Sequence, residues 1–258
     1  MPIISIDNKK VHIQELNKGA EQTVVLIHGM FSNLSIYYFN IAPMLARRYH
    51  VVMYDLKSHG MSERILNGYD LESMSSDLIG LMDFLQLKKV HLTGYSFGGL
   101  IALKTALKHP DRVDQLIIME APDPKDDKTR NIIDEYSREF LEYYVANFTD
   151  TTKVKMGKRQ MEKNHRLYEF LFGQTSIKTD MAGESDFLSE VRGLDIPTLL
   201  LYGSRSNCRP TGEWLNTQIG SSRLELIPGD HNIPIQEPGL IGESIVHFLS
   251  KSLTQNHG

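Results

Sequence analysis

Two kinds of hydrophobic segment alternate along most of the chain. Short runs of β-branched and aliphatic residues, each ending near a glycine, a proline or an acidic residue, are separated by longer amphipathic stretches. Continuous apolar runs of this length are typical of strands in a parallel sheet that helices cover on both faces. The pattern therefore predicts an α/β fold with a mostly parallel sheet and helices on both faces.

The same pattern places the expected elements. Helices are expected at about 35–47, 70–86, 97–109, 211–219 and 238–251. The expected strands are an N-terminal hairpin, Ile3–Ile6 and Val11–Leu16, followed by Thr23–Ile27, His50–Tyr54, Val90–Thr93, Gln115–Met119, Thr198–Tyr202 and Arg223–Ile227.

The alternation is interrupted once, between Glu120 and Ile196, where no strand-like run occurs and charged and aromatic residues are frequent. Within this interval, Lys125–Phe148 has apolar residues at spacings close to 3.6, which predicts a helix with one apolar face. We therefore expect one core domain, residues 1–122 and 194–258, with a mainly helical cap inserted at 123–193.

Composition limits the classes of protein that need to be considered. The chain has 258 residues and a formal net charge of −4, so an extended basic surface for nucleic acid is not expected. The single cysteine, Cys208, cannot form a disulfide within the chain, and Met1–Lys10 lacks the profile of a secretory signal. No apolar run approaches the roughly 18 residues of a membrane span. We expect a cytoplasmic monomer or homodimer that neither crosses a membrane nor binds nucleic acid.

A G-x-S-x-G motif covers Gly94 to Gly98, with Ser96 at its centre. The motif is short enough to occur by chance, but the predicted strand Val90–Thr93 precedes it and a predicted helix begins at Phe97. In this strand–turn–helix setting a nucleophilic serine projects from a tight turn, which the glycines permit. The helix start also directs free N–H groups toward developing negative charge. The simpler alternative is a glycine-rich turn that only packs the helix on the strand.

A second loop, His28-Gly29-Met30-Phe31, follows the predicted strand Thr23–Ile27 and faces the same end of the sheet as Ser96. An oxyanion hole requires two N–H donors that converge on one oxygen, and the amides of Met30 and Phe97 are the natural pair. We interpret His28 as a structural residue that holds this loop by hydrogen bonds.

A serine hydroxyl needs a base to accept its proton, and a histidine suits that role near neutral pH. Of the ten histidines, His231 follows the predicted strand Arg223–Ile227 through Pro228-Gly229-Asp230. It therefore lies at a strand's C-terminal end, where open α/β sheets keep their chemistry. We predict that His231 is the base for Ser96.

In combination, these motifs resemble those of the α/β-hydrolase superfamily, and the chain looks similar to small capped bacterial serine esterases and their C–C hydrolase relatives. The resemblance implies an α/β-hydrolase fold in which Ser96 is the nucleophile, His231 the base, and Met30 and Phe97 the oxyanion donors. It also implies a structural turn at His59-Gly60. The motifs that carry it are His28-Gly29, Asp55-x-x-x-His59-Gly60-x-Ser62, Gly94-x-Ser96-x-Gly98 and Gly229-x-His231.

The chain departs from the superfamily at the third member of the catalytic triad. Relatives usually carry an Asp three residues beyond the glycine that closes the strand Thr198–Tyr202, and this chain has Ser206 there. Glu120, at the end of the strand Gln115–Met119, is the preferred orienting acid, because a few relatives keep their acid at that location. Ser206 or Asn207 as an uncharged partner, and Asp123 or no acid at all, remain as alternatives.

A serine at the nucleophile position narrows the reaction. Relatives that open epoxides or displace halide carry a carboxylate there, whereas a serine forms a covalent acyl-enzyme. The resemblance therefore implies a carboxylesterase or thioesterase that hydrolyses a small to medium acyl substrate. Two alternatives stay open: a C–C bond hydrolase or lyase that uses the same serine and histidine, and a non-catalytic homologue that binds a ligand.

Aromatic residues are candidates for contact with the substrate, although side chains of this kind also pack against the core. From Lys153 to Arg166 the chain has six basic residues and one acidic residue, which can attract an anionic acyl substrate linked to a carrier or to coenzyme A. A solvated surface is the alternative. The aromatic candidates are Phe31, Tyr37, Tyr143 and Tyr144, with Phe140, Phe148, Tyr168, Phe170 and Phe172 as further cap residues.

We expect neither a metal nor a cofactor. The sequence has no His, Cys, Asp or Glu set at metal-ligand spacing, no G-x-G-x-x-G motif and no P-loop. Cys208 lies next to the loop of the missing acid, but no pattern in the sequence pairs it with a histidine. It is therefore not expected to be a nucleophile.

Overall fold

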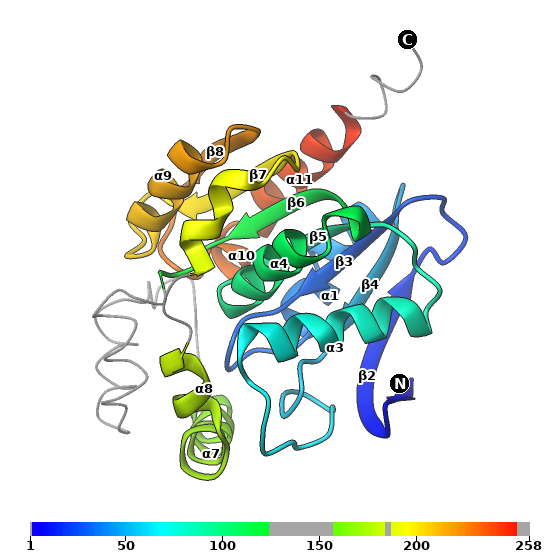
Figure 1. The fold of residues 1–258 in the computed structure, drawn as a ribbon, viewed down its shortest axis with the longest axis vertical. Helices are drawn as coiled ribbons and strands as arrows, with labels where there is room; N and C mark the ends of the chain where they lie inside the picture. The colour runs from blue at the N-terminus through cyan, green and yellow to red at the C-terminus, as the bar shows by residue number, and fades with distance from the viewer. Residues whose placement is uncertain (1, 124–156, 184–186, 252–258) are drawn as a thin grey trace.

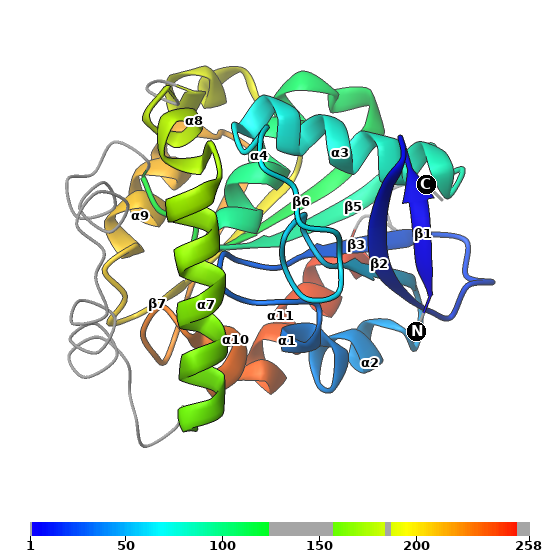
Figure 2. The same ribbon diagram turned by 90° about the horizontal axis from the view of Figure 1, so that it is seen from below.

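Eight strands form one sheet through the middle of the molecule, and helices cover both of its faces (Figures 1 and 2). This computed structural model describes residues 2–123, 157–183 and 187–251. The predicted α/β class with a mostly parallel sheet is confirmed. The strands are β1 (Ile3–Ile6), β2 (Lys9–Leu16), β3 (Thr23–Ile27), β4 (His50–Tyr54), β5 (Val90–Tyr95), β6 (Val113–Met119), β7 (Thr198–Gly203) and β8 (Ser222–Ile227).

The strand order across the sheet is β1-β2-β4-β3-β5-β6-β7-β8. β1 and β2 form the expected antiparallel hairpin, β2 is antiparallel to β4, and every pair from β4 to β8 is parallel. Because parallel strands end at the same edge of a sheet, the loops that follow β3, β5, β6, β7 and β8 all lie along one edge. All the motifs of the sequence analysis lie on or near this edge.

The helices divide between two apolar layers (Figure 2). Along β3, Val25 and Ile27 belong to one layer and Val24 and Leu26 to the other, so both faces of the strand need apolar residues. The first layer contains α3 (Leu71–Phe84), α4 (Phe97–Lys108) and α9 (Arg209–Gln218), and the second contains α1 (Ser35–Tyr38), α2 (Ile41–Leu45), α10 (Ile233–Gln236) and α11 (Pro238–Lys251).

One stretch that was predicted as a single helix forms two helices. The stretch 35–47 forms two short helices, α1 and α2, separated at Asn40, whose φ of −129° and ψ of −71° are not helical. Pro43 explains the break, because a proline clashes with the carbonyl four residues earlier in a helix, here that of Phe39. The short elements η1 (Pro110–Arg112) and α10 were not predicted.

The interval between β6 and β7 contains helices where it is described: α7 (Lys158–Gln174), α8 (Ile177–Gly183) and the 3₁₀ segment η2 (Phe187–Gly193). The Tyr69 N–H donates to Asp180 Oδ2 at 2.8 Å, and the Ser176 N–H donates to the Leu66 carbonyl at 2.8 Å, so α8 is attached to the segment between β4 and α3. The predicted helix Lys125–Phe148 lies outside the described residues, and the extent of the cap stays a prediction. None of the described helices has the length and apolar character that spanning a membrane requires.

Candidate active site

Ser96 occupies the turn between β5 and α4. Its φ of 53° and ψ of −119° are unusual for a residue with a side chain. The Ser96 N–H donates to the Met119 carbonyl of β6 at 2.8 Å, which holds the turn against the neighbouring strand. Such a backbone conformation is strained, and strain of this kind concentrates at functional sites.

The glycines of the motif are required by close packing of the backbone. A Cβ atom on Gly94 would lie 2.1 Å from the Gly98 carbonyl oxygen, and one on Gly98 would lie 2.3 Å from the Ile27 carbonyl oxygen. Neither position has room for a side chain. The first turn of α4 therefore packs directly on the ends of β3 and β5.

His231 lies in the loop between β8 and α10, and its Nε2 is 3.1 Å from Ser96 Oγ. The Tyr95 hydroxyl donates to the His231 carbonyl at 2.9 Å, and the Tyr95 and His231 rings are 5.3 Å apart between centroids. These contacts hold the imidazole beside the serine. The two side chains that the sequence analysis paired are thus within hydrogen-bonding distance.

Glu120 follows β6 directly and has a φ of 55°. Its Oε2 atom is 3.0 Å from His231 Nδ1, and its side chain is fully buried. The carboxylate also accepts hydrogen bonds from the Gly203 N–H and the Ser206 hydroxyl. Ser206 therefore contacts the acid rather than the imidazole, while Asn207 is exposed.

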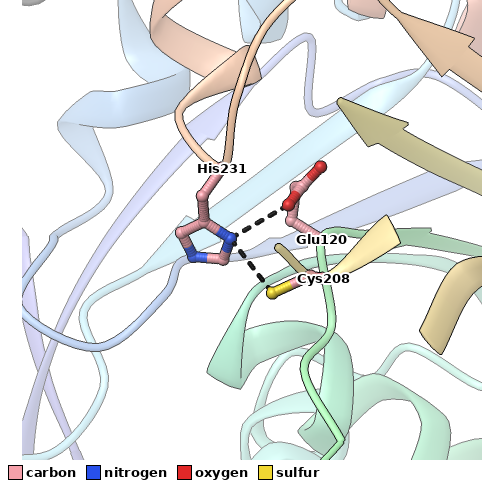
Figure 3. A group of neighbouring side chains, drawn as sticks. All are labelled: Glu120, Cys208 and His231. Carbon is pink, nitrogen blue, oxygen red and sulfur yellow. Dashed lines mark hydrogen bonds and ion pairs between the residues drawn. The ribbon is translucent and has the colours of Figure 1, made fainter. Parts of the chain in front are cut away.

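Cys208 is an unexpected member of this group (Figure 3). Its Sγ atom is 3.5 Å from His231 Nδ1, so the fold pairs this cysteine with a histidine although the sequence pattern does not. Ligand atoms of Glu120, Cys208 and His231 all lie within 4.8 Å of one another, which is close enough to hold a metal ion. Spacing along the sequence does not reveal this group, because the three residues come from separate segments of the chain, and the expectation that the protein binds no metal stays a prediction.

The electrostatic surroundings of His231 favour its protonated form. Burial by itself lowers the pKa of the imidazole, but interactions with Tyr95, Cys208 and Glu120 outweigh burial and raise the pKa well above its usual value. The hydrogen bond to the Glu120 carboxylate acts in this direction because it stabilises the positive charge. A raised pKa makes the neutral imidazole a stronger base, and its Nε2 lies 3.1 Å from Ser96 Oγ.

The loop after β3 is held by two buried histidines. His28 Nδ1 donates to the Gly29 carbonyl at 2.7 Å, and its Nε2 accepts from the Leu56 N–H at 3.0 Å. His59 Nδ1 donates to the Lys57 carbonyl at 2.9 Å, and its Nε2 accepts from the Phe31 N–H at 3.3 Å. In these roles both rings are neutral, and burial lowers the pKa of His28 and lowers that of His59 to about 3.

The amides of Met30 and Phe97 have the surroundings that an oxyanion site requires. The Phe97 N–H is the first of α4 and has no acceptor within the helix. The Met30 N–H donates no hydrogen bond to any part of the chain that the structure describes. A Cβ atom on Gly29 would lie 3.0 Å from Ser96 Cβ, so the Met30 loop lies directly against the serine.

The aromatic residues that were predicted to contact the substrate do not all lie together in the structure. Phe31 packs against Tyr168 and Phe172 of α7, with ring centroids 5.6 and 6.0 Å apart, which brings α7 next to the loop that follows β3. Tyr37 was expected near the substrate, but it is fully buried in the core layer of α1, and its hydroxyl donates to the Ile27 carbonyl at 3.0 Å. Because its hydroxyl is already bonded and no surface is exposed, Tyr37 is a core residue. Tyr143, Tyr144, Phe140 and Phe148 lie outside the described residues.

Comparison with known families agrees with the fold and the motifs. The model of the α/β hydrolase fold family matches residues 22–167, which include the strand–turn–helix around Ser96. The chain therefore belongs to the α/β hydrolase family. Membership supports a hydrolase and leaves the bond that it cleaves open.

Individual relatives extend over nearly the whole chain. A putative 2-succinyl-6-hydroxy-2,4-cyclohexadiene-1-carboxylate synthase of Bacillus subtilis (strain 168) is 27% identical over 267 residues, covering 95% of this chain and 96% of the relative. A thermophilic esterase from Thermogutta terrifontis superposes with a TM-score of 0.80 at 23% identity, covering 97% of this chain and 99% of the esterase. A meta-cleavage product hydrolase from Pseudomonas fluorescens IP01 gives a TM-score of 0.78 at 22% identity, covering 98% of each chain. At these identities the two structural likenesses establish the fold.

Proposed function

We propose that the protein is a serine hydrolase that cleaves a carboxylic ester or a thioester through an acyl-enzyme on Ser96. One observation carries the proposal: His231 lies between Ser96 and Glu120, within hydrogen-bonding distance of both. Ser96 Oγ is 3.1 Å from His231 Nε2, and Glu120 Oε2 is 3.0 Å from His231 Nδ1. In this arrangement the serine hydroxyl has a base beside it and the base has an acid beside it, which nucleophilic catalysis requires.

The proposed reaction has two halves. In the first, His231 Nε2 accepts the Ser96 proton while Ser96 Oγ attacks the carbonyl carbon, and the protonated imidazole then gives that proton to the leaving oxygen or sulfur. In the second, His231 accepts a proton from water, which attacks the acyl-enzyme carbonyl carbon. The protonated imidazole then returns this proton to Ser96 Oγ as the bond between Oγ and the acyl carbon breaks and the acid leaves. Glu120 supports both halves because its negative charge stabilises the imidazolium and fixes the Nδ1–H tautomer.

The oxyanion of each tetrahedral intermediate is proposed to accept hydrogen bonds from the Met30 and Phe97 amides. Both amides lie beside Ser96: the Met30 loop packs against the serine and is bonded to His59, and the start of α4 packs on the ends of β3 and β5. Loss of one such donor typically lowers turnover by about 10²–10³. The aromatic contact between Phe31 and α7 gives this side of the site an apolar boundary suited to an acyl chain.

The nature of the leaving group is a finer part of the proposal. Arg159, Lys163 and Arg166 are exposed on α7, in the basic stretch of the sequence. Their charge favours a thioester carried by coenzyme A or by an acidic carrier. Turnover of such a substrate should fall as salt is added, whereas salt-insensitive turnover would remove the support for an anionic carrier.

A C–C bond hydrolase or lyase is the second candidate function, and the full-length similarity to the putative synthase of Bacillus subtilis favours it. The same serine, histidine and oxyanion donors serve that chemistry. The two candidates differ in the substrate and not in the nucleophile.

The proposal is tested with p-nitrophenyl esters from acetate to decanoate, combined with a fluorophosphonate label that is located by peptide mass. We expect turnover and labelling in the wild type, and loss of both in Ser96→Ala. Ser35→Ala, which removes an exposed serine of α1, is the matched control and should retain both.

Other outcomes separate the alternatives. Labelling of Ser96 without ester turnover would replace the ester proposal by thioester, C–C or lyase substrates. Neither labelling nor turnover, with Ser96→Ala folded as the wild type is, would reject catalysis and favour a ligand-binding homologue.

A further inference from the structure

The proposed hydrolysis has no use for the thiol of Cys208. Its Sγ lies 3.5 Å from His231 Nδ1, on the side of the ring where Glu120 lies (Figure 3). The other ring nitrogen, His231 Nε2, is 3.1 Å from Ser96 Oγ. Cys208 is 7% exposed, and its N–H donates to Ser206 Oγ at 3.0 Å. The thiol is therefore held by the same loop that holds the Glu120 carboxylate.

The three side chains form a ligand set for a soft divalent ion. Sulfur, imidazole nitrogen and carboxylate oxygen are the ligands that Zn²⁺ binds in proteins. Tetrahedral Zn²⁺, at about 2.3 Å from sulfur and about 2.0–2.1 Å from nitrogen, separates those two ligand atoms by about 3.6 Å. The Cys208 Sγ–His231 Nδ1 distance of 3.5 Å fits this separation.

The carboxylate requires a small adjustment. Two ligands each at about 2.0–2.1 Å from a tetrahedral ion are about 3.3 Å apart, whereas Glu120 Oε2 is 3.0 Å from His231 Nδ1. A shift of a few tenths of an ångström therefore brings these two atoms to the separation that the ion requires, and the ligand atoms of all three residues already lie within 4.8 Å of one another. Water can supply the fourth ligand, as in other open zinc sites.

We propose that Glu120, Cys208 and His231 bind a soft divalent ion such as Zn²⁺, and that this ion reversibly inhibits the enzyme. The binding part stands on the geometry alone. The inhibitory part rests on the proposed function, because it requires His231 to act as the base for Ser96.

The proton transfers that accompany binding of the ion explain why a bound ion would inhibit the enzyme. Coordination uses the lone pair of His231 Nδ1, so the imidazole proton moves to Nε2, and the Cys208 thiol loses its proton to solvent. Nε2–H then donates toward Ser96 Oγ and can no longer accept the serine proton. The bond between Glu120 and the Nδ1–H is replaced by the bond to the ion.

Binding is tested first, with Co²⁺ as a spectroscopic substitute for Zn²⁺ and with untagged protein. Cys208 is the only cysteine of the chain, so a thiolate-to-cobalt charge-transfer band reports this site alone. We expect the band in the wild type and in Ser96→Ala, with one ion per chain, and its displacement by Zn²⁺. Cys208→Ala and Cys208→Ser should lose the band.

Two controls exclude other sites. His165→Gln removes a partly buried imidazole that lies 3.1 Å from Glu169 on α7, and it should leave the band unchanged. Mg²⁺, which prefers oxygen ligands, should not compete. Absence of the band from folded wild type, or its persistence in both Cys208 variants, would overturn the proposal.

Inhibition is measured second, as ester turnover against Zn²⁺ concentration, each variant being compared with its own metal-free rate. We expect inhibition of the wild type that a chelator reverses, and a half-inhibiting concentration at least about tenfold higher in Cys208→Ala. Equal inhibition of both would reject the inhibitory role. If the protein has no hydrolase activity, the cobalt band still decides the binding site independently of the proposed function.

Discussion

The carboxylate of Glu120 is surrounded by donors from three parts of the chain: His231, the Gly203 amide and the Ser206 hydroxyl. A fully buried carboxylate keeps its charge only when donors of this kind stabilise it. Ser206 stands where the resemblance to the superfamily places the acid, and its hydroxyl donates to Glu120, which we propose as the orienting acid. The loop after β7 thus supports the site by a hydrogen bond and not by a charge.

Substitutions of Glu120 and of Ser206, which donates a hydrogen bond to it, should have different effects on turnover. We expect Glu120→Gln to lower kcat by about a hundredfold or more, because an amide keeps the shape but can select the wrong tautomer of His231. Ser206→Ala removes one of three donors and should cost about tenfold or less. Near-wild-type kcat for both variants in a steady-state assay would exclude Glu120 as the orienting acid.

The raised pKa of His231 determines the acid side of the pH–activity profile. Only the neutral imidazole can accept the Ser96 proton, so kcat/KM should fall as the pH drops through the pKa of His231. Because interactions in the folded protein raise that pKa, half-maximal activity should lie above pH 6.5. In Glu120→Gln the midpoint should move to lower pH, since a neutral amide stabilises the imidazolium less. A wild-type midpoint below 6.5 would contradict this assignment.

At the scale of elements, the start of α4 is the part on which the site depends most. The helix packs its first turn against the ends of β3 and β5, which positions the Ser96 turn and the Phe97 amide together. The contact is made by backbone atoms, so it tolerates no added side chain.

Two glycine substitutions separate this close contact from general helix propensity. In Gly98→Ala the new Cβ would lie 2.3 Å from the Ile27 carbonyl oxygen, and we expect a loss of about 2 kcal/mol or more in the free energy of unfolding, with loss of turnover. In Gly173→Ala, in α7, the new Cβ meets no atom of the described residues within 4 Å, and the free energy of unfolding should stay unchanged or rise by about 0.5–1 kcal/mol. Urea denaturation of both variants is the measurement, and equal stabilities would refute the packing argument.

At the scale of the whole molecule, buried neutral histidines link stability to pH. Burial lowers the pKa of His59 to about 3 and that of His91, on β5, to about 4. Both values lie below the value of about 6.5 expected in the unfolded chain. Between pH 6.5 and 4 the unfolded chain therefore takes up protons that the folded protein does not.

The free energy of unfolding should consequently decrease as the pH falls below 6.5, by up to about 1.4 kcal/mol per pH unit for each of these histidines. His231 opposes this loss only near and above pH 6.5, because at lower pH its imidazole is protonated in the folded protein, where its pKa is raised, and in the unfolded chain as well. Chemical denaturation from pH 7.5 to pH 4.5 measures the slope. His91→Gln should show a shallower slope, and an unchanged slope in that variant would rule out His91 as a contributor.

The alternating apolar runs were sufficient to predict the α/β class, the hairpin and the order of strands along the chain, because a strand buried on both faces must be apolar throughout. Local motifs likewise predicted the Ser96 turn and the position of His231 after β8, since a tight turn needs glycine and parallel strands end at one edge. The break between α1 and α2 was missed, although Pro43 was its signal.

Only the tertiary structure decided the contacts among Glu120, Ser206 and Cys208, because these depend on how the ends of β6, β7 and β8 meet in space. Register across a sheet and the direction of a loop side chain leave no periodic trace in the sequence. For the same reason Tyr37 could not be distinguished from a pocket residue before its hydroxyl was seen to bind the Ile27 carbonyl. Local pattern determined which residues can do chemistry, and the packing of distant segments determined which of them meet.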